Sequence, residues 1–464
     1  MTPKARSPFD PSLDEMRAMG EEVLELVTQF IDDRYEARTS DYSSLEPLLT
    51  SLARPPRSEP GSLSTLLGTI EIAAGKGFDP ANPGFVGYIP GGGLYASALA
   101  DFVACVINRY TGISAPAPAL VQIEASVLRW LCDLFDLPDG SQGVLTPGGS
   151  MSNLSAIVAA RTNMLGENFL DGRMYVSDEV HHSITKSARI AGLPESAVCV
   201  VETDQDLRMN PEALQGAISR DRAQGLRPFM VVASAGTINT GAIDPLPDVA
   251  ELAEREEIWL HVDGAYGGFF QLTERGRARL RGIERADSIT LDPHKGLFLP
   301  YGTGCLLVKD AEQLRHAHEL QAHYLPALSE DPGLPDFSSF SPELTRDFRG
   351  LRLWLPLHLH GTDAFEAALN EKLDLAGVVY EDLNTITEFE VPWAPELSLV
   401  AFRPHGPGRG AKALLDRINS SGRMWLSSAE FRGHEYLRIC ILSHRSHPQR
   451  IHEGLQIIRA AAET

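Results

Sequence analysis

The sequence predicts an α/β fold in which helices cover both faces of a mostly parallel β-sheet. Between about residues 91 and 361, short apolar segments alternate with longer segments of helical character, and the clearest apolar ones are 174–176, 198–201, 229–233, 258–262 and 304–308. Strands that are apolar throughout, and not only at alternate positions, are typical of parallel sheets with two covered faces. Ligands of such folds bind at the carboxyl ends of the strands, so the functional site is expected there.

Residues 1–90 are expected to form an N-terminal helical segment. Apolar side chains recur at helical spacing from Leu13 to about Arg38, so a helix there exposes an apolar stripe that needs a partner. The stripe packs either against its own chain or against a second copy. A proline-rich stretch at residues 53–61 is typical of a linker.

Residues 91–361 are expected to form the large α/β domain, and the pattern changes after them. A helix at about 363–383 leads into apolar strands at 397–403 and 436–442. Residues 362–464 are therefore predicted to form a small C-terminal α+β domain.

Composition and charge narrow the functional classes. The chain has 464 residues and a formal net charge of −21, which argues against a nucleic-acid partner because phosphate backbones need a basic surface. No run of about 18 apolar residues occurs, so no membrane span is expected. The five cysteines are far apart and the N-terminus lacks an apolar leader, which favours free thiols in a reducing cytoplasm.

Two predicted strands end in residues that suit one cofactor. The apolar segment 258–262 ends at Asp263, and residues 288–291 end in a turn that carries Lys295. A carboxylate can keep a pyridine nitrogen protonated, and a lysine can form a Schiff base with an aldehyde. Pyridoxal 5′-phosphate (PLP) uses both. Because a protonated amine is a poor nucleophile, the pKa of Lys295 is expected to be depressed by a desolvated strand end and by His294.

The segments around these two residues carry a resemblance to a known family. His-Val-Asp-Gly-Ala-Tyr-Gly-Gly at residues 261–268 and Asp-Pro-His-Lys at 292–295 resemble the signature of group II PLP-dependent amino-acid decarboxylases, which include aromatic-amino-acid, glutamate and cysteine-sulfinate decarboxylases. The resemblance extends from about Asn82 to the C-terminus. It implies fold type I, like aspartate aminotransferase, with PLP bound by the large domain. It also implies a homodimer with shared active sites, with the N-terminal helices packed across it.

A glycine-rich turn and a histidine complete the expected cofactor site. Residues 146–153 precede an apolar helix, whose N-terminus favours an anion, although the Gly-Lys-Ser/Thr of a Walker loop is missing. The resemblance implies that His181 stacks on the ring, whereas the adjacent His182 does not match. Adjacent histidines seldom chelate one ion, so no metal site is predicted. The cofactor-binding residues expected are Ser150, Met151, Ser152, His181, Thr237, Asp263, Ala265, His294 and Lys295.

The expected substrate pocket is apolar. Tyr88, Ile89 and Pro90 lie in a segment that shapes this pocket in the family, where acid-specific relatives carry an Asn-Gln pair that is absent here. Thr345 falls where plant relatives distinguish indole from phenol side chains, and it matches neither usual residue. An aromatic or other apolar L-amino acid is therefore favoured, although these residues also suit simple packing. Arg438 is expected to be structural and not to clamp the substrate.

Two departures from the family pattern leave the chemistry partly open. Asp292 stands where relatives have asparagine, and a carboxylate facing the phosphate repels it. Residues 330–340 resemble the mobile catalytic loop, with Phe337 in place of the tyrosine thought to deliver a proton to Cα. The expected catalytic set is Lys295, Asp263, His181 and Phe337.

The leading hypothesis is a carboxy-lyase that releases carbon dioxide and an amine. The alternative, which Phe337 motivates, is oxygen-dependent decarboxylation to an aldehyde, ammonia and peroxide. This alternative fails if the loop around Phe337 aligns differently with the family or if another group donates the proton. A PLP-binding protein without turnover is a third class. A serine hydrolase is disfavoured because no Gly-x-Ser-x-Gly elbow occurs.

Overall fold

The structure is a computed structural model that describes residues 7, 9–319, 333–405 and 410–463. Its centre is a seven-stranded sheet in the spatial order β3-β9-β8-β7-β6-β4-β5. Strands β4 to β8 pair in parallel, and only β9 runs antiparallel to its neighbours. The predicted α/β fold with a mostly parallel sheet is confirmed. The strands are β3 (Gln142–Thr146), β4 (Gly172–Ser177), β5 (Val198–Val201), β6 (Arg227–Ser234), β7 (Trp259–Gly264), β8 (Ser288–Leu291) and β9 (Gly304–Val308).

Helices cover both faces of this sheet, which explains why its strands are apolar throughout. Along β6, Val231 and Ala233 belong to one buried cluster, and the alternating Met230 and Val232 belong to another. Because successive side chains of a strand point to opposite faces, each face needs its own apolar cover. The helices around the sheet are α5 (Pro118–Leu134), α6 (Gly149–Leu165), α7 (His182–Ile190), α8 (Pro211–Ala223), α9 (Leu246–Arg255), α10 (Glu274–Arg279) and α12 (Ala311–His318).

The strand ends that were singled out in the sequence lie at one edge of the sheet. Strands β7 and β8 are parallel, and Asp263 pairs with Thr290 in their register. Two residues beyond Thr290 comes Asp292, which precedes the short helix α11 (Pro293–Gly296). Helix α6 begins just after β3 at the same edge, because β3 and β8 both run antiparallel to β9. The topology therefore gathers Asp263, Lys295 and the start of α6.

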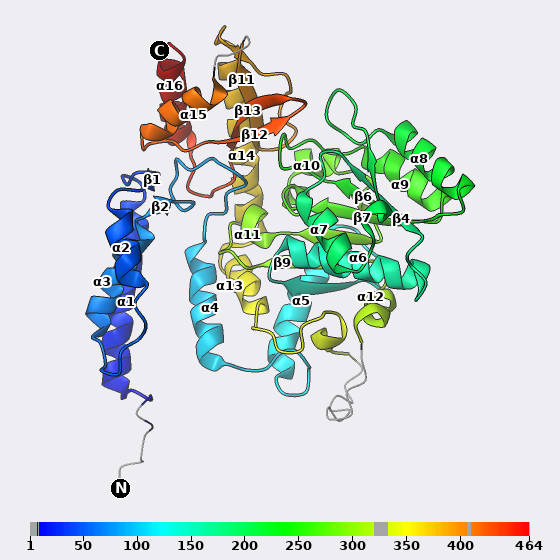
Figure 1. The fold of residues 1–464 in the computed structure, drawn as a ribbon. Helices are drawn as coiled ribbons and strands as arrows, with labels where there is room; N and C mark the ends of the chain where they lie inside the picture. The colour runs from blue at the N-terminus through cyan, green and yellow to red at the C-terminus, as the bar shows by residue number, and fades with distance from the viewer. Residues whose placement is uncertain (1–6, 8, 320–332, 406–409, 464) are drawn as a thin grey trace.

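The N-terminal helices stand away from this body (Figure 1). They are α1 (Leu13–Asp33), α2 (Leu45–Leu52) and α3 (Leu63–Ala74), and none of them contains a buried residue. Helix α1 starts with a capping box between Ser12 and Glu15 and ends five residues before the expected Arg38. The short strands β1 (Ser40–Asp41) and β2 (Gly77–Phe78) pair near its far end.

The C-terminal residues, from β10 onward, form a second sheet with its own helices (Figure 1). Its sheet has the order β10-β11-β13-β12, from β10 (Phe389–Glu390), β11 (Leu399–Pro404), β12 (Ser427–Phe431) and β13 (His434–Cys440). The backbone of Val86 donates to Trp425 and accepts from Cys440, so the segment around Val86 joins this layer. The remaining helices are α4 (Tyr95–Ile107), α13 (Gly350–His360), α14 (Thr362–Leu383), α15 (Ala411–Ser420) and α16 (Pro448–Ala462). Over the described residues, no helix combines the length and the apolar character that a membrane span requires.

Candidate active site

A cavity of about 340 Å³ opens where the ends of β6, β7 and β8 meet the start of α6. Its volume is in the range of small-molecule sites. All the predicted cofactor residues except Ser152 line it: Ser150, Met151, His181, Thr237, Asp263, Ala265, His294 and Lys295. Ser152 is buried behind the turn, where its hydroxyl lies 2.8 Å from that of Thr146 and supports the glycine-rich segment.

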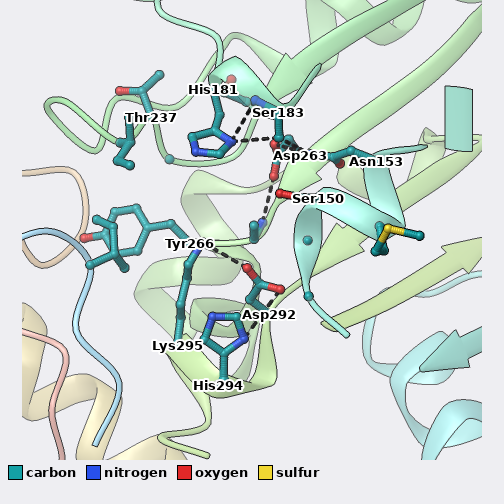
Figure 2. A pocket seen from close by; sticks show the side chains of 18 of the residues that line it. Ser150, Asn153, His181, Ser183, Thr237, Asp263, Tyr266, Asp292, His294 and Lys295 are labelled. Carbon is teal, nitrogen blue, oxygen red and sulfur yellow. Dashed lines mark hydrogen bonds and ion pairs between the residues drawn. The ribbon is translucent and has the colours of Figure 1, made fainter. Parts of the chain in front are cut away.

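Asp263 is held by two neutral donors (Figure 2). Its Oδ2 accepts a hydrogen bond of 3.0 Å from Asn153 Nδ2, and its Oδ1 accepts one of 3.1 Å from the backbone of Ala265. A carboxylate with both oxygens bonded to neutral groups is fixed in orientation and keeps its negative charge available to a cation.

Asn153 is a residue that the sequence reasoning missed. It lies on the buried face of α6, and the same amide nitrogen donates to Ser183 Oγ at 3.0 Å. Its Oδ1 lies 3.0 Å from Nε2 of His261, which is completely buried. The available signal was a bulky polar side chain on a helix face otherwise made of small and apolar residues.

His181 caps the N-terminus of α7 and faces the cavity. Its Nδ1 lies 2.7 Å from Ser183 Oγ and accepts from the Ser183 backbone at 3.3 Å. Burial is the main influence on its pKa, which it lowers, so the ring is neutral near physiological pH. The ring of the exposed His182 lies against it at a tilt of 50°, with 4.2 Å between the ring centres.

Lys295 corrects one expectation. Its Nζ lies 3.0 Å from Asp292 Oδ2. Burial, the largest influence, favours the neutral amine, but the charge and hydrogen bond of Asp292, together with the charge of Asp263, outweigh it and raise the pKa of Lys295. The predicted depression was therefore wrong, because the sequence argument weighed desolvation and His294 without a neighbouring carboxylate.

The part of the cavity at the start of α6 suits an anion. Helix α6 starts there, and a Cβ on Gly149 would come within 3.0 Å of Asp292 Oδ2, so glycine is required for this close approach. His294 Nδ1 donates to the carbonyl of Thr303 at 2.7 Å, which fixes its ring. Asp292 Oδ1 is buried and has no hydrogen-bond partner in the described part of the chain.

Of the predicted substrate residues, only Ile89 lines this cavity. Tyr88 is 49% exposed, has a φ of 52° and packs against Trp425 at 5.5 Å between ring centres. Pro90 is buried outside the lining, and Thr345 is exposed. A single copy of the chain therefore does not bring Tyr88, Pro90 or Thr345 to its own site.

Phe337 also lies elsewhere than expected. It sits in a short 3-10 helix (Phe337–Ser339), is fully buried, and stacks under the guanidinium of Arg346 at 5.0 Å. Arg346 is itself paired with Glu124 at 2.6 Å. The placement of Phe337 on a mobile loop is wrong, since its ring is part of the core and does not line the cavity. Residues 330–332 of the predicted loop fall outside the described residues.

Arg438 supports the wall of the site. It donates to the carbonyls of Ile238 and Asn239, the first of which belongs to the cavity lining. These contacts fit the structural role that was expected for Arg438. Among the described residues, no cluster of three or more potential metal ligands occurs.

These groups fit one class of cofactor. The carboxylate of Asp263 matches a ring nitrogen that carries a proton, the helix N-terminus matches a phosphate, and Lys295 matches an aldehyde. The buried Oδ1 of Asp292 lies 3.7 Å from His294 Nδ1 and, as an acceptor without a hydrogen bond among the described residues, can take one from a bound donor but not from an anion. The fold and the donor set are those of a fold type I PLP-dependent enzyme.

Comparisons with known proteins identify the family. Residues 58–405 match the pyridoxal-dependent decarboxylase conserved domain. The aromatic-L-amino-acid decarboxylase of Bacillus atrophaeus is 32% identical over 97% of this chain and 96% of that protein. The phenylacetaldehyde synthase of Arabidopsis thaliana is 29% identical over 82% of each. A crystal structure of Oryza sativa TDC with PLP and tryptamine has a TM-score of 0.93 and 24% identity, over 99% of each chain. The chain belongs to the pyridoxal-dependent decarboxylase family and is a PLP-dependent amino-acid decarboxylase.

Proposed function

We propose that the enzyme decarboxylates an L-amino acid with an aromatic or other apolar side chain to the amine. The observation that carries this proposal is the position of Lys295 and Asp263 on one cavity that Ile89 also lines. The chain lacks the Asn-Gln pair of acid-specific relatives, and the Bacillus atrophaeus relative is named for aromatic substrates.

The roles of the chain's own groups follow from their positions. Bound PLP supplies an aldehyde carbon for amine exchange and a ring that accepts the electron pair left at Cα when carbon dioxide departs. Asp263 would hold a proton at the ring nitrogen, and Ser150 with the α6 N-terminus would hold the phosphate. His181 would cover one face of the ring. Lys295 Nζ must release a proton before it can react, and Asp292 Oδ2, at 3.0 Å, is placed to take it.

We propose further that the working enzyme is a cytoplasmic homodimer with shared sites. Helix α4 leaves Phe102 67% and Val106 70% exposed, and helices α1 and α3 expose Leu24 and Ile70 by half or more. Large exposed apolar side chains on these helices favour an interface. A second copy over these faces would also explain why Tyr88 and Thr345 are exposed in one copy. The domain limits 1–90, 91–361 and 362–464 remain part of this proposal.

The experiment incubates the PLP-loaded protein in air with aromatic and acidic L-amino acids and measures carbon dioxide, amine and peroxide together. We expect carbon dioxide and amine in equal amounts from aromatic substrates and little turnover of acidic ones. Preferential turnover of glutamate or cysteine sulfinate would overturn the substrate proposal. Light scattering of the same sample tests the dimer.

The oxidative alternative is kept because the Arabidopsis thaliana relative is named phenylacetaldehyde synthase. The replacement of a loop tyrosine by Phe337 no longer supports this alternative, because Phe337 is buried and does not line the cavity. Peroxide formed in step with carbon dioxide would support it, and strict amine formation would exclude it.

A further inference from the structure

We propose that Asn153 is a positioning residue that sets the hydrogen-bonding direction of both Asp263 and His181, through a directed chain of buried hydrogen bonds that begins at Trp259. This inference rests on the cofactor roles proposed above for Asp263 and His181. Asn153 also lines the cavity, and in this inference it acts on the cofactor through Asp263 and His181. The inference also assigns the proton of His181 to one ring nitrogen.

The direction of the chain is set at Asp263. An ionised carboxylate only accepts hydrogen bonds, so the group of Asn153 that lies 3.0 Å from Asp263 Oδ2 must be its NH₂. The amide oxygen then faces Nε2 of His261 at 3.0 Å. An oxygen there can only accept, so His261 must carry its proton on Nε2.

The far end of the chain agrees with this assignment. Burial, as the main cause, lowers the pKa of His261 to about 4, so the ring is neutral and has one N–H. With the proton on Nε2, Nδ1 must accept, and Ser288 Oγ lies 2.8 Å from it. Trp259 Nε1 can only donate, and it donates to the same Ser288 oxygen at 2.8 Å. The Ser288 hydroxyl proton is thus directed to His261.

The second branch runs from Asn153 to His181. The other amide hydrogen of Asn153 donates to Ser183 Oγ at 3.0 Å, so the proton of that hydroxyl points to His181 Nδ1 at 2.7 Å. The Ser183 backbone N–H donates to the same nitrogen at 3.3 Å. Nδ1 therefore accepts from both, and the neutral ring of His181 carries its proton on Nε2.

One amide group thus serves both cofactor-facing residues. Asp263 is kept as a hydrogen-bond acceptor of fixed orientation. His181 presents a hydrogen-bond donor, the N–H of Nε2, because its Nδ1 is occupied by Ser183. A carboxylate placed beside His181 Nε2 would therefore accept a hydrogen bond from it. The titratable and charged groups around this chain of hydrogen bonds are His181, His182, His261, Lys295, Asp263 and Asp292.

The test compares Asn153→Asp with wild type. The new carboxyl group is the same size but, when ionised, repels Asp263 and loses both donated hydrogen bonds. We expect PLP affinity, followed by cofactor absorbance, to fall by about tenfold or more at mildly alkaline pH. The gap should narrow as pH falls, because a protonated carboxyl at position 153 can donate again. A purely packing role predicts a loss that does not change with pH.

The matched control is Asn163→Asp on the same helix. Asn163 also donates from Nδ2, to the carbonyls of Ala159 and Gln313 at 2.8 Å each, but it lies away from the cavity. We expect its PLP affinity to equal that of wild type at every pH. Equal affinity of Asn153→Asp and wild type across the pH range would overturn the inference.

A second measurement does not depend on the cofactor or on the variant folding. Nitrogen chemical shifts of ¹⁵N-histidine-labelled protein without PLP report which ring nitrogen carries the proton. We expect the Nε2–H form for both His181 and His261, and an Nδ1–H form of either would overturn the inference. If wild type fails to bind PLP while both shifts are as expected, the proposed cofactor roles fail and the hydrogen-bond chain stands.

Discussion

Two buried carboxylates at the ends of neighbouring strands, Asp263 and Asp292, have opposite surroundings (Figure 2). Among the residues that the structure describes, Asp263 bonds to two neutral donors and to no cation. Asp292 pairs with the cation of Lys295 at 3.0 Å and leaves its Oδ1 without a hydrogen-bond partner in the described part of the chain. Both are at most 8% exposed, so burial does not distinguish them.

The difference separates a permanent charge from a transient one. Asp263 gains its hydrogen bonds from groups that do not react, so its charge remains available to a cationic ring nitrogen. The charge of Asp292 is balanced by Lys295, the lysine that reacts with the cofactor in the proposed chemistry. When Lys295 reacts, Asp292 loses its counter-ion, and a buried charge without a partner is costly.

The largest expected effect comes from Asp263→Asn. The amide is the same size but has no charge to hold a proton on a ring nitrogen. Its NH₂ group must also face one of the two donors, Asn153 Nδ2 or the Ala265 backbone, that Asp263 accepts from. We expect the decarboxylation rate at saturating PLP to fall by roughly 10²–10³-fold, as when a preorganised electrostatic group is removed.

The control for this variant is Asp171→Asn, which makes the same charge change at the surface, where Asp171 pairs with Arg227. Its rate should match that of wild type. A rate for Asp263→Asn within a few-fold of wild type would show that the carboxylate is not the ring-nitrogen partner.

Asp292→Asn should have a smaller effect of the opposite kind. Without the carboxylate that raises the pKa of Lys295, desolvation dominates and the amine loses its proton at lower pH. We expect PLP to be captured about tenfold faster at neutral pH, and the rise of this rate with pH to begin at lower pH. Stopped-flow absorbance measures the rate. A slower capture would mean that Asp292 orients Lys295 more than it restrains its proton.

The sequence predicted the fold from local pattern, and the family resemblance supplied most of the cofactor residues that line the cavity. Continuous apolar strands gave the parallel sheet, and strand ends gave Asp263 and Lys295. What failed depends on contacts between distant segments. The pKa of Lys295 is set by the orientation of Asp292, Asn153 comes from a different helix, and Phe337 is held in the core by Arg346. None of these contacts leaves a periodic signal.

The next prediction concerns the histidine behind Asp263. The pKa of His261 is about 4 in the folded chain and near 6.5 when exposed, so the unfolded chain takes up the proton first as pH falls. Its contribution to the free energy of unfolding is complete above pH 6.5 and is lost between pH 6.5 and about 4. The loss is roughly 3 kcal/mol, from about 1.4 kcal/mol for each pH unit.

Urea unfolding of the cofactor-free protein across that range measures the loss. His261→Gln should show a shallower decline in the unfolding midpoint than wild type, because it removes one group that must stay neutral. His452→Gln changes a histidine on the exposed side of α16 and should decline as wild type does. Parallel curves for His261→Gln and wild type would contradict the assignment.

The smallest effect is expected from Phe337→Tyr. Its added hydroxyl enters a fully buried site under Arg346, so stability should fall by about 1–2 kcal/mol, while the ratio of amine to peroxide should stay the same. The companion variant is Tyr324→Phe, because Tyr324 is the only tyrosine between His318 and Phe337 in the sequence, although it lies outside the described residues. A shift toward peroxide in Tyr324→Phe alone would assign the proton-delivering phenol to that residue. Any change in the ratio of amine to peroxide in Phe337→Tyr would instead return Phe337 to the catalytic set, because a side chain confined to the core cannot change the product.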